Sequence, residues 1–450
     1  MELLYESVQL ESLVKKDEEF VSKVLKDDSL TFAEKILSLK RIDEERKIAY
    51  KDEIVIASPD LTMATDGTGP LAVKIFNEMG AEKIFDPKRV LLVADHTFPA
   101  SNERVSAMQK LMREFAFKHG VYYTESNICH QYLLDVFDVP GMLLLGADSH
   151  TVTAGAVGAF ATGIGSTEVA SIWISGSTWL RVPPSFKIIL DGDIPKGVYS
   201  KDIILHIIGR VTIDGATYMS VEFTGPVVSK LSIDARATMS NMSVEMGAKT
   251  GIFPPDEQTR KFLEEVSRKP MYWIHPGKEA VYDKELYVDV SKIEPTVAEP
   301  FSPGNAREIS DVEGIEIDQA FLGSCTNGRL EDLKIAARIL EKAMKEGKKV
   351  HPRVRMIVTP ASKRVYYNAM KEGLIDIFLK AGAVVTNPTC GACVGTHLGI
   401  LADNEVAISS SNRNFVGRMG ARTSKVYLAS PATVAASAIE GKITDPRKYL

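Results

Sequence analysis

The amino-acid sequence predicts an α/β protein of three α/β/α units, with mainly parallel, doubly wound sheets around a central cleft. Short apolar runs typical of buried strands alternate with amphipathic helical patterns along most of the chain. Proline-rich stretches at residues 182–184 and 294–303 interrupt this alternation and mark the expected boundaries. Polar and sulfur-bearing side chains follow directly after many predicted strands, where ligands bind in open parallel sheets.

The first unit is expected at residues 51–184, where strands and helices alternate. Its predicted strands are residues 53–57, 89–94 and 142–146, and its predicted helices are residues 101–119 and the stretch from Ser166 onward. A further helix is expected to open in the segment 65–70. This alternation indicates parallel strands joined by helical crossovers.

The second unit is expected at residues 185–300, and the third, which carries three of the four cysteines, at residues 301–450. The elements predicted for the second unit are strands 186–190 and 219–223 and helices 201–210, 234–247 and 256–268. The strands predicted for the third unit lie near residues 319–323, 354–358, 383–386, 405–409 and 425–429. The segment 294–303 between the two units is predicted to be a linker.

Residues 1–50 are predicted to form a helical extension without chemistry of its own. Two amphipathic helices are expected, at residues 10–25 and 31–50, with Ser29 or Thr31 as the N-cap of the second. A packing role against the body of the protein is the expected function of this segment.

Composition narrows the classes of protein and partner. The chain has 450 residues, 45% of them hydrophobic, and a formal net charge of −5, which argues against nucleic acid as the main partner. No apolar run is long enough to span a bilayer, and the N-terminal residues mix both charges, unlike a signal peptide. Four cysteines are too few for a disulfide framework. We therefore expect a cytoplasmic protein that binds neither membrane nor nucleic acid.

Three cysteines occur in two similar loop motifs. Cys390 and Cys393 follow an apolar run at residues 383–385 and precede a helical pattern from Gly395 to Leu401, and Cys325 also lies between a predicted strand and a helix. Because a helix N-terminus lowers the pKa of a thiol, this placement predicts acidified thiols suited to metal binding. Three thiolates can hold a four-iron cluster and leave one iron open to substrate oxygens, where it acts as a Lewis acid.

The residues alone leave two other interpretations of the cysteines open. His397 follows Cys393 by four positions and could complete a zinc site, and the thiols could also be buried without a metal. The Gly, Pro and Asn residues around the thiols favour the cluster. Cys129 has no second thiol nearby and is predicted to be a small packed side chain.

Histidines and aspartates also follow predicted strands. Asp95 and His96 end one apolar run, Asp148 and His150 end another, and His130 lies in a loop region. An aspartate beside a histidine fixes the imidazole and raises its basicity, which suits acid–base catalysis. Each pair alone would pass for ordinary polar loop residues, but their number at strand ends indicates a site.

The sequence leaves the roles of two further pairs of residues open. Asn241 and Glu245 are four residues apart in a Met-rich segment, so they share a helix face, either as a buried carboxylate with a partner or as an exposed pair. Arg413 and Arg418 lie on one loop, and guanidinium groups suit the carboxylates of a di- or tricarboxylic acid. A solvated surface loop is the alternative for the arginines.

Taken together, these motifs resemble the signatures of the aconitase superfamily, in family order and over residues from about 30 to the C-terminus. The motifs that carry the resemblance are the segments 93–96, 129–131, 146–151, 241–245, 323–329, 387–393 and 411–418. Within the superfamily the chain is most similar to the large-subunit group of 3-isopropylmalate dehydratase and homoaconitase. The resemblance implies an aconitase-like fold and reversible dehydration of a hydroxy acid.

The resemblance also implies a cofactor and roles for individual residues. It implies a [4Fe-4S] cluster on Cys325, Cys390 and Cys393. The residues that it makes catalytic are Asp95, His96, His130, Asp148, His150 and Glu245. Those that it places at the substrate or cluster pocket are Thr65, Asp66, Ser149, Asn241, Asn412, Arg413 and Arg418.

One part of the family is expected on another chain. Single-chain aconitases carry a swivel domain after the third unit, and its serine removes the proton from carbon. This sequence stops at Leu450, directly after the last predicted strand–helix unit. The resemblance therefore implies a separate small subunit that completes the active site.

Two departures from the family pattern leave the substrate open. Thr65 and Ala154 stand where relatives usually place histidines, and both changes are expected to shrink polar side chains near the cleft. Besides 3-isopropylmalate and homoaconitate, the substrate could be dimethylmalate, citraconate or methylmalate, or maleate. An RNA-binding iron sensor, as some aconitases are, is the alternative from another class, and the negative net charge argues against it.

Overall fold

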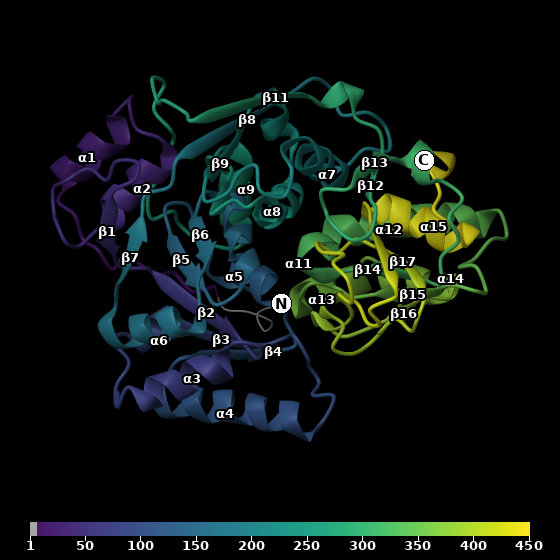
Figure 1. Ribbon diagram of the computed structural model, residues 1–450, viewed down its shortest axis with the longest axis horizontal. Coiled ribbons are helices and arrows are strands. Elements are labelled where there is room, and N and C mark those ends of the chain that lie inside the picture. Colours follow the sequence, from purple (N-terminus) through teal and green to yellow (C-terminus); the bar gives the residue numbers. More distant parts are fainter. Residues whose placement is uncertain (1–6) are drawn as a thin grey trace.

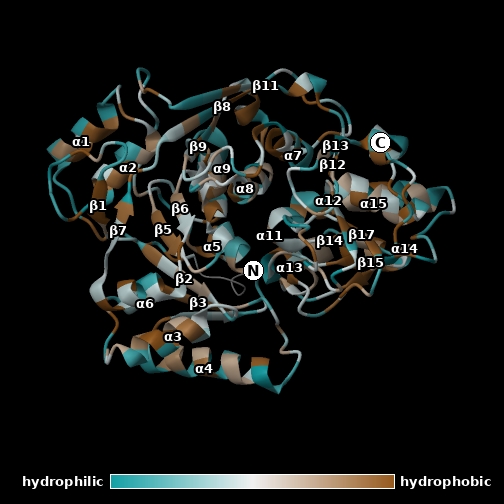
Figure 2. Cartoon of the chain, in the orientation of Figure 1, coloured by the Kyte–Doolittle hydropathy of each residue, from teal (hydrophilic) through white to brown (hydrophobic). Residues whose placement is uncertain are grey.

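The computed structural model describes residues 7–450, and their strands form four sheets (Figure 1). Three of these sheets form the bodies of three α/β units, and the third unit lies beside the first two, on the right of Figure 1. Apolar side chains fill the layers between helices and sheets, so the central strands, such as β5, are hydrophobic in Figure 2. None of the helices in residues 7–450 combines the length and apolar character needed to cross a bilayer.

The first unit is an entirely parallel five-stranded sheet with the order β4-β3-β2-β5-β6. Its strands are β2 (Leu61–Thr65), β3 (Val90–Ala94), β4 (Tyr122–Glu125), β5 (Leu143–Gly146) and β6 (Phe160–Gly163). Its helices are α3 (Gly69–Glu78), η1 (Pro87–Arg89), α4 (Glu103–His119), α5 (Cys129–Val136), η2 (Ser149–Val157) and α6 (Ser166–Ser175). The chain moves outward from β2 to β4 and then returns beside β2 with β5. This reversal is the switch point at which open parallel sheets bind ligands.

The second unit is a parallel four-stranded sheet with the order β10-β9-β8-β11. Its strands are β8 (Ser185–Asp191), β9 (Ser220–Thr224), β10 (Thr250–Ile252) and β11 (Lys284–Asp289). Its helices are α7 (Ser200–Val211), η3 (Pro226–Lys230), α8 (Ile233–Met242), η4 (Ser243–Met246), α9 (Glu257–Glu265) and η5 (Val290–Lys292). The helix predicted at 234–247 therefore ends early and continues as a 3-10 turn, which stops at Gly247 with φ +86°.

The third unit is a seven-stranded sheet with the order β13-β12-β18-β17-β14-β15-β16. Its strands are β12 (Thr296–Ala298), β13 (Ala306–Glu308), β14 (Gln319–Leu322), β15 (Arg355–Val358), β16 (Val384–Val385), β17 (Val406–Ser409) and β18 (Lys425–Leu428). Its helices are α10 (Ile309–Val312), α11 (Ser324–Asn327), α12 (Leu330–Lys345), α13 (Lys363–Lys371), α14 (Leu374–Ala381), η6 (Gly391–Val394), α15 (Pro431–Glu440) and η7 (Pro446–Tyr449). The prediction of a linker at 294–303 was wrong, because β12 pairs antiparallel with both β13 and β18.

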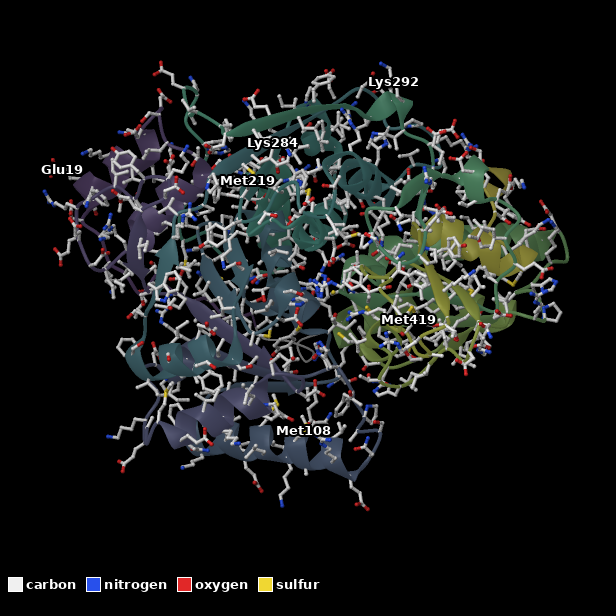
Figure 3. The ribbon with its side chains drawn as sticks, viewed as in Figure 1. Glu19, Met108, Met219, Lys284, Lys292 and Met419 are labelled. Atoms are coloured by element: carbon white, nitrogen blue, oxygen red, sulfur yellow. The ribbon has the colours of Figure 1, made fainter. Side chains whose placement is uncertain are left out.

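The N-terminal segment packs on the first two units, although it is less helical than predicted. Helix α1 (Glu18–Lys26) begins after the N-cap Asp17, and α2 (Phe32–Lys40) begins at Thr31, which forms a capping box with Glu34. Residues 41–50 are not helical. Lys40 makes a buried ion pair of 2.8 Å with Asp60 in the first unit. The outer face of α1, with Glu19 86% exposed, points to solvent (Figure 3). Residues 1–6 of the predicted extension lie outside the described residues.

A fourth, two-stranded sheet lies beside the first sheet, and a close backbone contact joins the first unit to the second. Strands β1 (Ile54–Ala57) and β7 (Thr178–Arg181) pair antiparallel. Gly155 in η2 touches the backbone of the second unit, because a Cβ atom at this position would lie 1.9 Å from the carbonyl oxygen of Gly251 in β10. Only glycine permits this approach, which holds η2 against β10.

Candidate active site

The carboxyl ends of strands from the first and third sheets meet at one place. Asp95 and His96 follow β3, and Asp148 and His150 follow β5. From the third unit, Cys390 donates its backbone N–H to the carbonyl oxygen of Asp95 at 2.9 Å. The hydroxyl of Thr389 donates to the same oxygen at 2.7 Å. The thiol-bearing turn of one unit is thus fixed directly on the aspartate–histidine turn of the other.

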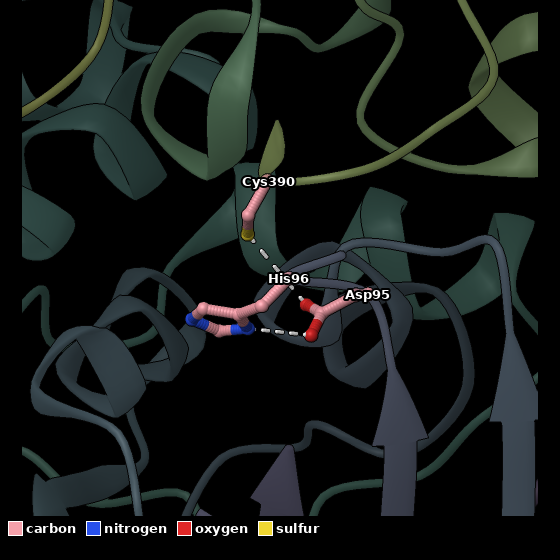
Figure 4. Close-up of side chains that lie close together, drawn as sticks. All are labelled: Asp95, His96 and Cys390. Atoms are coloured by element: carbon pink, nitrogen blue, oxygen red, sulfur yellow. Dashed lines mark hydrogen bonds and ion pairs between the residues drawn. The ribbon is translucent and has the colours of Figure 1, made fainter. Parts of the chain in front are cut away.

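His96 lies between two carboxylates. Its Nδ1 is 2.7 Å from Asp95 Oδ1, as Figure 4 shows, and its Nε2 is 3.4 Å from Asp148 Oδ2. Burial alone would lower the pKa of His96, but the two carboxylates outweigh it and raise this pKa well above its usual value. His96 is therefore a protonated imidazole at neutral pH, and it can donate a proton within the cleft.

Asp148 connects the three histidines. It accepts from His130 Nε2 at 2.9 Å and from the backbone N–H of His150 at 2.8 Å, and it faces His96. Burial would raise the pKa of this carboxyl, but His130 and His96 hold it well below its usual range. Asp148 therefore stays ionised and orients the histidines around it.

His150 has the opposite environment from His96. Its Nε2 is 2.7 Å from Glu245 Oε1, and Glu245 also accepts from Arg413 Nε at 2.8 Å. Burial and the positive charge of Arg413 lower the pKa of His150 to about 4 despite the carboxylate. Burial would raise the pKa of Glu245, but His150 and Arg413 lower it. Of the two interpretations left open for Glu245, the buried, paired carboxylate is confirmed.

Asp66 acts mainly on the backbone in this structure. Its carboxylate accepts from the backbone N–H groups of Asp95, His96 and Thr97 at 3.2, 2.8 and 3.2 Å. It also accepts from the side chain of Gln109 at 3.0 Å. Asp66 thus fixes the turn that carries His96. Gln109 lies in α4 with no motif around it, so no sequence signal could have identified it.

The two departures from the family pattern lie in buried surroundings. Thr65 is fully buried, with its hydroxyl 3.3 Å from that of Thr68. Ala154 packs in an apolar cluster with Leu133 and Met142. Ala154 is therefore part of the core packing, and its effect on the cleft stays a prediction.

Three thiols are buried at the site, and amide and guanidinium groups point at them. Asn241 Nδ2 lies 3.2 Å from Cys325 Sγ, and Asn412 Nδ2 lies 3.5 Å from the same sulfur. Toward Cys393 the direction is reversed, because its Sγ donates to Asn412 Oδ1 at 3.8 Å. Arg418 Nη2 is 3.9 Å from Cys393 Sγ. N–H donors directed at sulfur stabilise thiolates, so this donor set fits a thiolate-bound metal cofactor.

The predicted acidification of the thiols was wrong for the chain without metal. Burial raises the pKa of Cys325 to about 12 and that of Cys390 well above its usual value. The helical elements at the thiols are only four residues long, and the helix predicted from Gly395 to Leu401 is absent. Such short elements provide little dipole, so a bound cation would have to supply the charge that deprotonates these thiols.

The positions of the three thiols disfavour a site in which all three cysteines bind one zinc ion. A tetrahedral zinc site with bonds of about 2.3 Å places sulfur atoms about 4 Å apart. Within residues 7–450 the only set of three potential ligand atoms within 4.8 Å of one another comes from Asp95, His96 and Cys390. His397 packs against the turn at Gly391, with both ring nitrogens buried and without a hydrogen-bond partner. The three thiols therefore do not all lie within 4.8 Å of one another, which is wider than a site with one zinc ion requires.

Other predicted residues border the site in different ways. Ser149 Oγ is 3.5 Å from His150 Nδ1. A groove of about 560 Å³, lined in part by Asp148, Ser149, Tyr218 and Lys249, opens beside them. The loop that carries Arg413 is not a solvated surface loop, because Ser411, Asn412 and Asn414 are buried. Cys129 is a packed side chain, as predicted.

Arg329 makes a structural contact that its sequence motif did not predict. Its guanidinium donates to the carbonyl oxygens of Cys325 and Thr326, and the side chain is fully buried. The motif 323–329 suggested a helix start after the thiol, but a side chain that folds back on its own turn leaves no periodic signal.

Comparisons with known proteins identify the family of the chain. The family model described as "Aconitase family (aconitate hydratase)" matches residues 34–314 and 307–441. The large subunit 1 of 3-isopropylmalate dehydratase from Methanopyrus kandleri is 48% identical over 424 residues, which cover 93% of this chain and 99% of the relative. The large subunit from Aquifex aeolicus is 48% identical over 421 residues, 93% of this chain and 97% of the relative.

A solved structure of Thermococcus kodakaraensis aconitase X in its holo-form covers 80% of this chain and 84% of that chain, with a TM-score of 0.48 and 13% identity. The sequence matches are far stronger and extend through all three units. With nearly half of the residues identical over almost the whole length of these relatives, the chain belongs to the aconitase family.

Proposed function

We propose that the chain is the large subunit of a hydro-lyase that reversibly dehydrates and isomerises 3-isopropylmalate. The observation that carries the proposal is the contact between the Asp95–His96 turn and the Cys390 turn, which joins acid–base groups to thiols. The relatives of 46–48% identity are named 3-isopropylmalate dehydratase large subunits, and no finding supports homoaconitase or the other dicarboxylate hydratases better.

Membership of the aconitase family implies an iron–sulfur cluster, and we propose that it is a [4Fe-4S] cluster on Cys325, Cys390 and Cys393. The buried thiols and the donors from Asn241, Asn412 and Arg418 support this choice. When bound, a cluster with one iron free of protein ligands would supply a Lewis acid for hydroxyl and carboxylate oxygens.

The chain's own residues would move protons and hold the substrate. His96, protonated and backed by Asp95, would give its proton to the leaving hydroxyl group, and Asp148 with His130 would keep it oriented. His150, neutral and held by Glu245, would donate or accept a hydrogen bond without changing charge.

Arg413, Arg418 and Ser149 are the proposed contacts for substrate carboxylates. Thr65, Asp66, Asn241 and Asn412 remain predicted parts of the pocket, with Asp66 acting through the turn that it holds.

We propose a small-subunit partner that completes the site with the base for the carbon-bound proton. The support is the name of the relatives, which are large subunits, together with the resemblance to single-chain aconitases. Full dehydratase turnover by this chain alone would contradict the proposal.

The test is anaerobic purification of the chain with and without a co-expressed small subunit, followed by iron and sulfide analysis, EPR and a panel of hydroxy acids. We expect a brown protein and turnover of 3-isopropylmalate by the pair. Cys393→Ser should lose colour and activity, whereas Cys129→Ala, a matched change at the packed cysteine, should keep its iron. A colourless zinc protein would overturn the function.

A further inference from the structure

Lys201, in the first turn of α7, is a fully buried lysine that joins the second unit to the thiol-bearing third unit. Its Nζ donates to the backbone carbonyls of Ser410 and Ser411 at 2.7 and 2.6 Å. It also donates to Asn327 Oδ1 at 3.3 Å. Asn327 ends the short helix that carries Cys325, and Ser411 directly precedes Asn412. One ammonium group thus holds both turns that surround the sulfur of Cys325.

The partners of Lys201 differ from those of another buried lysine. Lys40 is also fully buried, and its ammonium is 2.8 Å from the carboxylate of Asp60. The three acceptors of Lys201 are neutral oxygens, and no carboxylate of residues 7–450 forms an ion pair with it. A buried ammonium without a direct counter-charge is unfavourable, so a nearby negative charge is needed to keep Lys201 protonated.

The charges that face Lys201 at longer range are two carboxyls and two thiols. Burial lowers the pKa of Lys201 to about 7, while Asp332, Cys393, Asp202 and Cys325 act in the other direction. Asp332 and Asp202 are themselves buried, which raises the pKa of each to about 7, so they supply only part of a negative charge at neutral pH. Thiols that bind a metal are deprotonated and would supply the rest.

We propose that Lys201 is a positioning residue that locks the Cys325 and Asn412 turns and serves as the counter-charge of metal-bound thiolates at Cys325 and Cys393. The inference rests on the proposed cluster, and it adds a residue from the second unit to the cluster site. Arg329 complements it, because its guanidinium holds the carbonyls of Cys325 and Thr326 from within the same turn.

The test compares Lys201→Met with Lys35→Met in the full chain, purified anaerobically with its partner subunit. Lys35 is a suitable control, since it is 2% exposed and its ammonium also donates to a carbonyl, that of Leu25 at 3.0 Å. The readouts are iron and sulfide per chain, the rate of iron loss to a chelator and the reduction potential of the cluster, with circular dichroism to check folding.

Lys201→Met should lose iron to the chelator at least tenfold faster than the wild type. Its reduction equilibrium should shift about tenfold toward the oxidised cluster, or about 59 mV for a one-electron couple, because a positive charge is lost. Lys35→Met should match the wild type, and Lys201→Arg should recover part of the potential.

An iron-loaded Lys201→Met protein with wild-type iron retention and potential would overturn the inference and leave the proposed function intact. Where Lys201→Met does not fold, Lys201→Gln, which keeps a hydrogen-bond donor without the charge, carries the test, and an unchanged potential would overturn it. A wild type that binds no iron would overturn the proposed function, and the role of Lys201 would fall with it.

Discussion

Two sheets with the same strand order face each other at the candidate active site, and they supply different chemistry. The first unit has the order β4-β3-β2-β5-β6, and the parallel part of the third has the corresponding order β16-β15-β14-β17-β18. Turns after equivalent strands carry Asp148 and His150 in one sheet and Asn412 and Arg413 in the other. Topology therefore determines where the reactive groups gather, and the turn residues determine whether the sheet supplies proton transfer or metal binding.

The contrast extends to single histidines. His96 contacts carboxylates from its own sheet, which raise its pKa, whereas His150 contacts a carboxylate that is shared with Arg413 of the other sheet, and its pKa falls to about 4. The same side chain is thus a proton donor on one side of the site and a neutral group on the other. The following predictions test this difference.

Asp148→Asn should have the largest effect, because this carboxylate faces three histidines of the first unit, His96, His130 and His150. The loss of its charge lowers the pKa of His96, so we expect kcat to fall about 10³-fold. The pH dependence of kcat measures the change. Asp376→Asn, at an exposed carboxylate of α14, is the control, and an unchanged pH profile in Asp148→Asn would contradict the assigned roles.

Arg413→Met should make His150 resemble His96. Without the guanidinium, Glu245 remains the main charged neighbour, so the pKa of His150 should rise from about 4. The loss of a carboxylate-binding group should lower kcat/KM about 10²-fold. NMR titration of the histidines measures the first effect, with the exposed Arg422→Met as control. A His150 pKa that stays at about 4 would show that burial alone sets it.

Because His150 is neutral in the folded protein, we also predict that the folded protein becomes less stable at acidic pH. Its folded pKa of about 4 is below the unfolded value of about 6.5, so the unfolded chain binds more protons between these pH values. The stabilising contribution is therefore complete above pH 6.5 and is lost as the pH falls toward 4, by about 2 kcal/mol at pH 5. Urea unfolding at pH 7 and pH 5 measures it. His150→Gln should lose less stability over this interval, and an equal loss would assign the effect to other groups.

Of these variants, Ser149→Ala should have the smallest effect on stability and activity. Its hydroxyl is 3.5 Å from His150 Nδ1, a weak contact, so removing it should cost less than about 1 kcal/mol of stability. A rise in KM of up to about fivefold without a change in kcat would be consistent with a carboxylate contact. A large loss of kcat would instead make Ser149 part of the proton-transfer group.

Local sequence patterns predicted the strands that carry the site, and long-range pairing explains most of the errors. The runs at 89–94 and 142–146 are β3 and β5, since continuous apolar residues suit a strand buried on both faces. The segment 294–303 was mistaken for a linker, because β12 depends on pairing with β18, far away in the chain. Helix α2 ends at Lys40, where buried Arg41 turns to bind Asp43 and the carbonyl of Ile48.

The site was predictable where motifs place reactive atoms and unpredictable where burial sets their charge. His96, His150 and the thiols were identified from their positions after strands, whereas His130, which was predicted in a loop, lies in the first turn of α5. The high pKa of Cys325 and the low pKa of His150 depend on neighbours from other units, which no local pattern contains. Lys201 was assigned only to a predicted helix, and its burial arises from the third unit packing on it.

The glycine contact between η2 and β10 has a practical consequence for dissecting the protein. At Gly155 there is no room for a side chain, because a Cβ atom there would lie 1.9 Å from the carbonyl oxygen of Gly251 in the second unit. A fragment that ends near residue 184 would expose this bare backbone surface to solvent and would lose the Glu245 partner of His150. Calorimetry of the intact chain should therefore show these two units melting in a single transition, and expressing either one alone should yield aggregation-prone material.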